Sequence, residues 1–179
     1  MTRTPRSFRV LVAALLASAV GYGSAFAVDG THTEPAKQAH VCKTGYVWSE
    51  KAKECVKITS GLVDPKGLFQ EGRALAKAGH YDEALTVLAA ADQKDSMVLT
   101  MIGYSKRKQG HWDEGVGYYN QALAINPNNV NTREYLGEAW LTKGRADLAK
   151  AELIKIGAIA GTGSEQYGLL AKAIAGAGI

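Results

Sequence analysis

The chain has 179 residues, of which 46% are hydrophobic, and its 21 Lys and Arg against 17 Asp and Glu give a net charge of +4. This length suits one ordinary domain or a short repeat array. The first 27 residues hold three arginines and no acid, so the remaining chain carries a net charge of only +1. Because nucleic-acid binding needs a concentrated basic surface, this balance excludes a nucleic-acid partner.

The N-terminus has the features of an export signal. Three arginines precede an eleven-residue apolar run, Val10–Val20, and small residues two positions apart end at Ala27. This order predicts a secretory signal peptide over residues 1–27. The alternative, a membrane anchor, is disfavoured because a bilayer crossing needs ~20 apolar residues. We therefore expect cleavage after Ala27, no membrane span afterwards, and a periplasmic or secreted protein.

A small disulfide-closed hairpin is expected over residues 41–58, after a flexible leader over residues 28–40. Its cysteines, Cys42 and Cys55, are the only two in the chain, and disulfides persist in the oxidising compartments that an exported protein reaches. Aromatic and β-branched residues on both sides of a polar turn predict two short strands. Since an isolated two-stranded hairpin is marginally stable, the disulfide would stabilise it.

The hairpin aromatics have two interpretations. Tyr46 and Trp48 are two residues apart and share one face of the first strand. One hypothesis is that they stack on a sugar ring or an apolar partner surface. The other, which we favour, is that Trp48 covers the disulfide and docks the hairpin on its neighbour. A metal site of His32, His40 and Cys42 lacks a short ligand spacing, so neither a metal nor a cofactor is expected.

Two sets of glycines recur through the rest of the chain, at steps of 31 and then 34 residues. In the middle unit, Gly103 lets two helices approach closely, and Gly110 ends the first helix by permitting a left-handed backbone. Pro127 stops the second helix. The two sets are Gly72, Gly103 and Gly137 and, seven residues later in each unit, Gly79, Gly110 and Gly144.

This periodicity resembles the tetratricopeptide repeat family, whose units are pairs of antiparallel helices. The resemblance covers residues 64–156. It implies an all-α superhelix of about three helix-turn-helix units, assigned to residues 65–95, 96–129 and 130–159. The disulfide hairpin precedes this stack.

The third unit departs from the family pattern at two positions, and the C-terminal part adds an element. Ala146 stands where an aromatic residue is usual. Arg133 stands where a large apolar residue is usual, and we expect Tyr135 to take over that contact. An amphipathic helix over residues 164–176, with Ser164 as its N-cap, is expected to cover the end of the stack. The signal, hairpin, repeats and tail together resemble a group of small exported repeat proteins of Gram-negative bacteria.

A catalytic set is not recognisable. His80 and His111 occupy the same repeat position, so repeat register explains their recurrence. No Ser or Cys nucleophile has a His partner by motif. The chain is therefore not expected to be an enzyme.

The family resemblance also implies a binding groove, because the first helices of the pairs line the concave side of the stack. The groove positions are basic in the first two units, with Phe69, Met97 and Tyr104 as apolar anchors, and acidic in the third. The implied set is Lys66, Phe69, Arg73, Lys77, Met97, Tyr104, Arg107, Lys108, Asn131, Glu134 and Glu138.

The primary hypothesis is a non-catalytic periplasmic adaptor that binds a peptide or protein segment of another envelope protein in this groove. The hairpin would add a second contact. Two alternatives remain: a cell-wall or glycan-binding module that acts through Tyr46 and Trp48, and a structural subunit of an envelope assembly.

Overall fold

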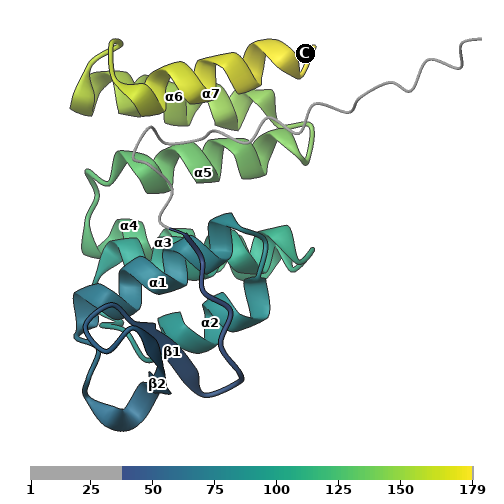
Figure 1. Cartoon of the computed structure of the whole chain (residues 1–179). Helices are drawn as coiled ribbons and strands as arrows, with labels where there is room; N and C mark the ends of the chain where they lie inside the picture. Colours follow the sequence, from purple (N-terminus) through teal and green to yellow (C-terminus); the bar gives the residue numbers. More distant parts are fainter. Residues whose placement is uncertain (1–37, 179) are drawn as a thin grey trace, which may run out of the picture.

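The computed structural model describes residues 38–178, so the expected signal peptide and most of the leader lie outside the described residues. Within that range a two-stranded sheet precedes seven α-helices (Figure 1), which confirms the predicted fold class. No helix between residues 38 and 178 has the length and apolar character needed to cross a membrane. The elements are β1 (Tyr46–Ser49), β2 (Glu54–Lys57), a short 3-10 helix (Ile58–Ser60), α1 (Pro65–Lys77), α2 (Tyr81–Ala89), α3 (Ser96–Lys108), α4 (Trp112–Ile125), α5 (Val130–Leu141), α6 (Ala146–Ala160) and α7 (Glu165–Gly176).

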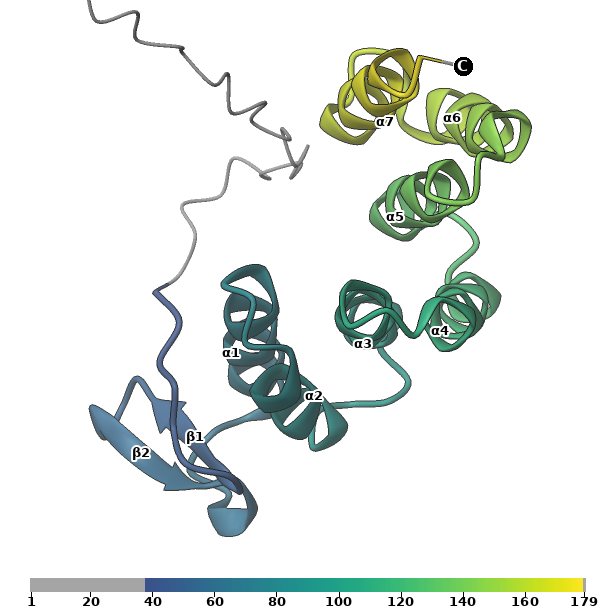
Figure 2. The same cartoon turned by 90° about the vertical axis from the view of Figure 1, so that its right-hand side faces the viewer.

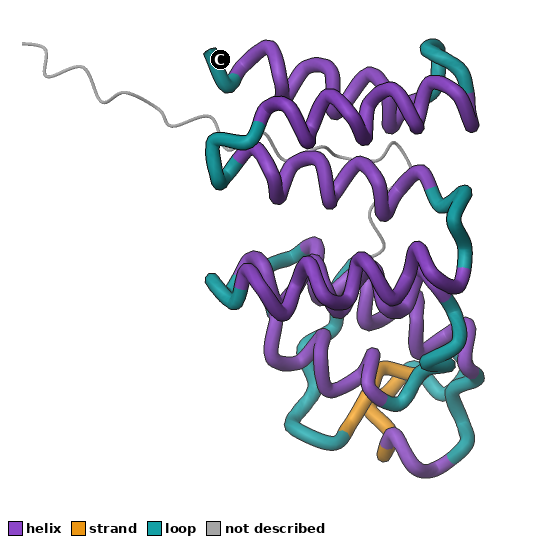
Figure 3. The backbone as a smooth tube through the Cα atoms, turned by 180° about the vertical axis from the view of Figure 1, so that it is seen from behind, coloured by secondary structure: helices purple, strands orange, loops and turns teal. Residues whose placement is uncertain are grey.

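The helices stack as three pairs, α1 with α2, α3 with α4 and α5 with α6, and α7 packs on α5 and α6. Figure 2 shows the stack end-on as an arc, with α1, α3, α5 and α7 along its inner side and α2, α4 and α6 outside. Figure 3 places the two strands at one end of the stack and α6 and α7 at the other. The first helix of each pair therefore lines the concave side.

Helix boundaries follow from capping residues and glycines. Asp64 Oδ1 accepts a 2.6 Å hydrogen bond from Gly67 N at the start of α1. Asn129 Oδ1 accepts one of 3.2 Å from Thr132 N at the start of α5. Each bond satisfies an N–H that has no partner within its helix. Gly110, with a φ of +91°, follows α3 in the left-handed conformation that lets the chain reverse.

The second helix pair is closely packed because glycines face each other. A Cβ on Gly103 would lie 2.8 Å from the carbonyl oxygen of Gly115 and 2.8 Å from ring atoms of Tyr119. Real Cβ atoms do not come this close, so only glycine permits this crossing of α3 and α4. Tyr119 is fully buried beneath it, and burial raises the pKa of its phenol to about 12.

Buried polar side chains join the second unit to the third. The hydroxyl groups of Thr100 on α3 and Thr132 on α5 lie 2.6 Å apart, and both residues are fully buried. Thr100 donates its own proton to the carbonyl oxygen of Ser96, so Thr132 donates to Thr100. Asn129 Nδ2 adds a 2.8 Å bond to Ser96 Oγ. Such satisfied buried groups specify one arrangement of the two units.

The hairpin is part of the protein core. Cys42 and Cys55 form the expected disulfide, with Cα atoms 5.9 Å apart. Val47 and Val56 lie opposite each other in the two strands, and both are buried in the hydrophobic core that the helices share. Val47 and Val56 therefore dock the hairpin on the helices. Trp48 is half-buried and lies opposite Cys55 in the strand register, and the expectation that it covers the disulfide and helps to dock the hairpin stays a prediction.

The last helix covers the far end of the stack. Leu170 on α7 is fully buried, and a Cβ on Gly137 of α5 would lie 2.6 Å from a methyl carbon of Leu170. Ser164 occupies the N-cap position of α7, but its side chain makes no capping hydrogen bond. Its hydroxyl instead donates to the carbonyl oxygen of Gly161 at 2.8 Å.

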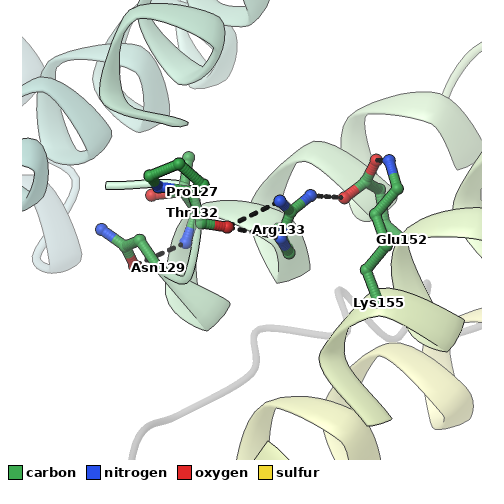
Figure 4. A network of polar contacts seen from close by, with 6 residues as sticks. All are labelled: Pro127, Asn129, Thr132, Arg133, Glu152 and Lys155. Atoms are coloured by element: carbon green, nitrogen blue, oxygen red, sulfur yellow. Dashed lines mark hydrogen bonds and ion pairs between the residues drawn. The ribbon is translucent and has the colours of Figure 1, made fainter. Parts of the chain in front are cut away.

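Arg133 is accommodated by polar contacts (Figure 4). Its guanidinium donates to the carbonyl oxygen of Pro127 at 2.6 and 3.1 Å and to Glu152 Oε2 at 2.8 Å. Lys155 Nζ donates to the other Glu152 oxygen at 2.6 Å. Tyr135 packs among tyrosines of α3 and α4, and the expectation that it takes over the missing apolar contact stays a prediction.

Candidate functional site

The concave surface carries the side chains that the repeat register implies. Helices α1, α3 and α5 bring five of them together at its centre: Lys77, Tyr104, Arg107, Glu134 and Glu138. The others lie along the same helices and differ in exposure. Lys66 and Lys108 are exposed, and Phe69, Arg73, Met97 and Asn131 are half-buried.

Tyrosine rings packed at a tilt, with cations over their faces, form the middle of this surface. The ring centroids of Tyr104 and Tyr135 are 5.3 Å apart, and Lys77 Nζ lies 4.8 and 5.0 Å from them. Lys108 Nζ is 5.4 Å from the centroid of Tyr104. A cation at these distances is attracted to the face of an aromatic ring. The arrangement holds positive charge at the junction of α1, α3 and α5.

Carboxylates of α5 lie next to these cations. Arg107 Nη2 donates to Glu138 Oε2 at 2.9 Å, and both side chains are largely buried. Glu134 is fully buried, and burial, reinforced by the negative charge of Glu138, raises its pKa to about 8. A carboxyl group with this pKa is mostly protonated at neutral pH. In the predicted acidic third unit, Glu134 is thus mostly neutral, and Glu138 is paired with Arg107.

Two members of the implied set are not accessible to a partner. Tyr104 is 3% exposed and Glu134 is 0% exposed. The side chains of neighbouring helices cover Tyr104, so its assignment as an apolar anchor is wrong. Half-buried Phe69 and Met97 remain as the apolar positions that a partner could reach. Sequence spacing places a residue on a helix face but does not show how deep it lies.

Helix α7 also contributes to the concave side, which the sequence interpretation missed. Gln166 Nε2 on α7 donates to Asn131 Oδ1 on α5 at 3.1 Å. Glu165 lies close enough for its charge to help raise the pKa of Glu134. Treating α7 only as a cap concealed this role. The alignment of Gln166 with the inner row of α1, α3 and α5 could have indicated it.

The hairpin aromatics are engaged within the chain. Trp48 stacks on His40 with ring centroids 4.2 Å apart and planes 9° from parallel. Lys43 Nζ lies 4.3 Å from the ring centroid of Tyr46. Each ring therefore has one face covered, which favours the packing interpretation over a glycan platform. Cys42 is disulfide-bonded, and residues 38–178 contain no cluster of three or more His, Cys, Asp or Glu placed to hold a metal ion.

A comparison with protein families agrees with this architecture. Residues 106–173 match the family model of the tetratricopeptide repeat. The match runs from the end of α3 into α7, and the pair α1 and α2 precedes it with the same helix-turn-helix form. A comparison with curated protein sequences gives no match.

Solved structures with a tetratricopeptide-like fold are similar to the chain. The translocator chaperone SycD of Yersinia enterocolitica type III secretion has a TM-score of 0.56 at 18% identity, over 64% of this chain and 91% of SycD. PcrH, solved with the chaperone-binding region of PopB, has a TM-score of 0.52 at 21% identity, over 62% and 92%. The Cut9–Hcn1 complex has a TM-score of 0.53 at 21% identity, but only 23% of that chain is covered. These likenesses show the fold.

Proposed function

We propose that the protein is a non-catalytic interaction scaffold that binds a segment of a partner protein on its concave surface. The observation that carries this proposal is the composition of that surface. Exposed Lys66 lies on α1 with half-buried Phe69 one turn further along the helix, exposed Lys108 lies on α3, and Asn131 and Glu138 follow on α5. A segment with an apolar side chain and acidic residues complements this pattern.

The structural neighbours support a protein segment as the partner. SycD is described as a translocator chaperone, and PcrH was solved with the chaperone-binding region of PopB. The chain shares their helical stack over about two thirds of its length. The residues on the concave surface of this chain, and not those of its neighbours, determine which partner segment it can bind.

Export to the periplasm or secretion is the second part of the proposal. The order of charged, apolar and small residues before Ala27 supports a cleaved signal. The Cys42–Cys55 disulfide supports it independently, because such bonds persist in oxidising compartments. The partner would then be another envelope or exported protein.

Photo-crosslinking tests the concave surface. A photoreactive residue replaces Lys108 in one strain and Lys150, an exposed residue of α6, in another. We expect a discrete protein adduct from position 108 and none from position 150, with mass spectrometry naming the partner. Equal adducts at both positions, or none at position 108, would contradict the proposal.

A matched pair of double variants tests the contribution of side chains. Phe69→Ala with Lys108→Glu removes an apolar group and reverses a charge on the inner side. Ile154→Ala with Lys150→Glu makes a similar apolar truncation and the same charge reversal on α6, where Ile154 is 72% exposed. We expect the first to weaken capture of the crosslinked partner at least tenfold and the second to leave it unchanged, while circular dichroism shows both folded. Equal losses of partner capture in the two double variants would contradict the assignment of the concave surface as the binding site.

A further inference from the structure

A second cleft lies at the N-terminal end of the stack, between the hairpin and α2. Its volume is about 440 Å³, within the range of small-ligand sites. The chain segment before β1, together with β1, forms one wall, and α2 forms the other. Figure 2 shows the hairpin beside α1 and α2, at the end of the arc. None of the residues assigned to the concave surface lines this cleft.

The lining combines an apolar part with carboxylates. Val47, Leu75 and Val87 line the cleft and are each at most 2% exposed. Asp82 and Glu83, in the first turn of α2, line it as well. Asp82 Oδ1 accepts a 2.6 Å hydrogen bond from Gln109. The half-buried Glu83 forms no hydrogen bond through its side chain and no ion pair with any residue from 38 to 178.

In the second repeat, basic side chains accompany the equivalent glutamate. Glu114 stands 31 residues after Glu83, in the same repeat position, and its carboxylate contacts Lys106 Nζ at 2.9 Å and His111 at 3.3 Å. The position equivalent to Lys106 in the first repeat is Leu75, which lines the cleft. The first repeat has therefore kept the carboxylate and replaced its cation with an apolar surface. An added ligand can supply the missing cation.

We propose that this cleft binds a lysine or arginine side chain of a partner protein, with its charged group at Glu83. The aliphatic stem of such a side chain would cover Val47, Leu75 and Val87, as long basic side chains do on apolar surfaces. Its charged end would form a charge-assisted hydrogen bond to the carboxylate. Lys43, on the opposite wall, is held over the ring of Tyr46.

The hairpin thereby has a function beyond covering the end of the helical stack. The hairpin supplies Val47 and the segment from Lys43 to Tyr46, and without them Glu83 would lie on an open helix surface. The site is separate from the concave surface. The cleft can prove not to bind lysine while the concave surface binds a partner, and the cleft can bind lysine while the concave surface binds none.

Backbone amide NMR of the purified, disulfide-bonded protein tests the cleft. The probes are N-acetyl-lysine N-methylamide and, as a matched control without the charge, N-acetyl-norleucine N-methylamide. We expect the lysine probe to shift the amide signals of Thr44, Gly45, Glu83 and Thr86 with millimolar affinity, and the norleucine probe to bind at least tenfold more weakly.

Two variants make the test specific. Glu83→Gln keeps the shape and removes the charge, and it should weaken lysine binding about tenfold, as expected for loss of one charge-assisted hydrogen bond. Glu114→Gln is the repeat-matched control and should leave binding unchanged. The proposal is overturned if the two probes bind equally, if Glu83→Gln binds lysine as well as the wild type, or if the signals that shift belong to the concave surface.

Discussion

The two ends of the helical stack are covered in different ways. At the C-terminal end, α7 places Leu170 against Gly137 and buries it completely. At the N-terminal end, two four-residue strands place Val47 and Val56 on the first helix pair, and a disulfide closes the hairpin. A helix has enough apolar side chains to hold itself in place by packing. The hairpin has few, so it also needs a covalent constraint.

The difference shows that a repeat stack requires a cover at each end but not a particular structure. A packed helix stabilises the folded state through burial of apolar surface. A disulfide acts mainly by restricting the unfolded chain. Mutations at the two ends should therefore differ in size and in their response to redox conditions.

The largest effect is expected at the C-terminal end. Leu170→Ala removes a fully buried side chain and leaves a cavity beside Gly137, so we expect a loss of about 2–5 kcal/mol in the free energy of unfolding. Urea unfolding followed by circular dichroism measures it. Leu169→Ala, at a half-buried position of the same helix, should cost less. Equal costs for the two would show that α7 is not held by Leu170.

Removing the disulfide comes next. Cys42→Ser with Cys55→Ser opens a 13-residue loop, and the chain-entropy relation gives a loss of about 3 kcal/mol. A reducing agent should destabilise the wild type by the same amount and leave the double variant unchanged. If reduction does not alter the unfolding midpoint of the wild type, packing of Val47 and Val56 alone holds the hairpin.

The pH dependence of stability probes the α5–α7 contact. Burial, with the charges of Glu138 and Glu165, raises the pKa of Glu134 to about 8, against the positive charges of Lys77 and Arg107. Between its ordinary pKa and 8, the folded state keeps a proton that the unfolded state releases. The free energy of unfolding should therefore fall as the pH rises from about 5 to about 8, by on the order of 3 kcal/mol.

Glu134→Gln supplies the comparison for this prediction. The variant cannot titrate at this position, so the difference in unfolding free energy between it and the wild type isolates Glu134 from the histidines. The unfolding free energy of the wild type minus that of the variant should fall as the pH rises from about 5 to about 8. A difference that is constant between pH 5 and pH 8 would mean that Glu134 is ionised throughout.

The smallest effect is expected at the hairpin surface. His40→Ala removes the ring that stacks on Trp48 and the 3.3 Å contact between His40 Nδ1 and Glu71 Oε1. We expect the free energy of unfolding, measured by urea unfolding, to fall by about 1 kcal/mol, since an aromatic pair and a partly exposed hydrogen bond each contribute modestly. A loss above that of the disulfide variant would make His40, and not the disulfide, the main constraint on this end.

The sequence predicted the repeat fold well because its signals are local. Gly110 in the left-handed conformation and the close crossing at Gly103 both follow from the recurring glycines. What it missed depends on contacts between helices. The pairing of Arg133 with Glu152 and the burial of Tyr104 join residues that no short spacing connects. The cleft at Glu83 likewise depends on the hairpin, which packs against α2 from a distant part of the sequence.

The Thr100–Thr132 hydrogen bond has a mechanical consequence. A hydrogen bond is directional, so it resists rotation between the second and third units, whereas apolar contacts permit sliding. The equivalent positions at the preceding junction are Phe69 and Val98, which are both apolar, and the hydrogen bond from Gln109 to Asp82 across that junction is exposed to solvent. A change in superhelical curvature when a partner is grasped would therefore concentrate between α1 and α3. The second and third units would then move together as one rigid body relative to the first unit.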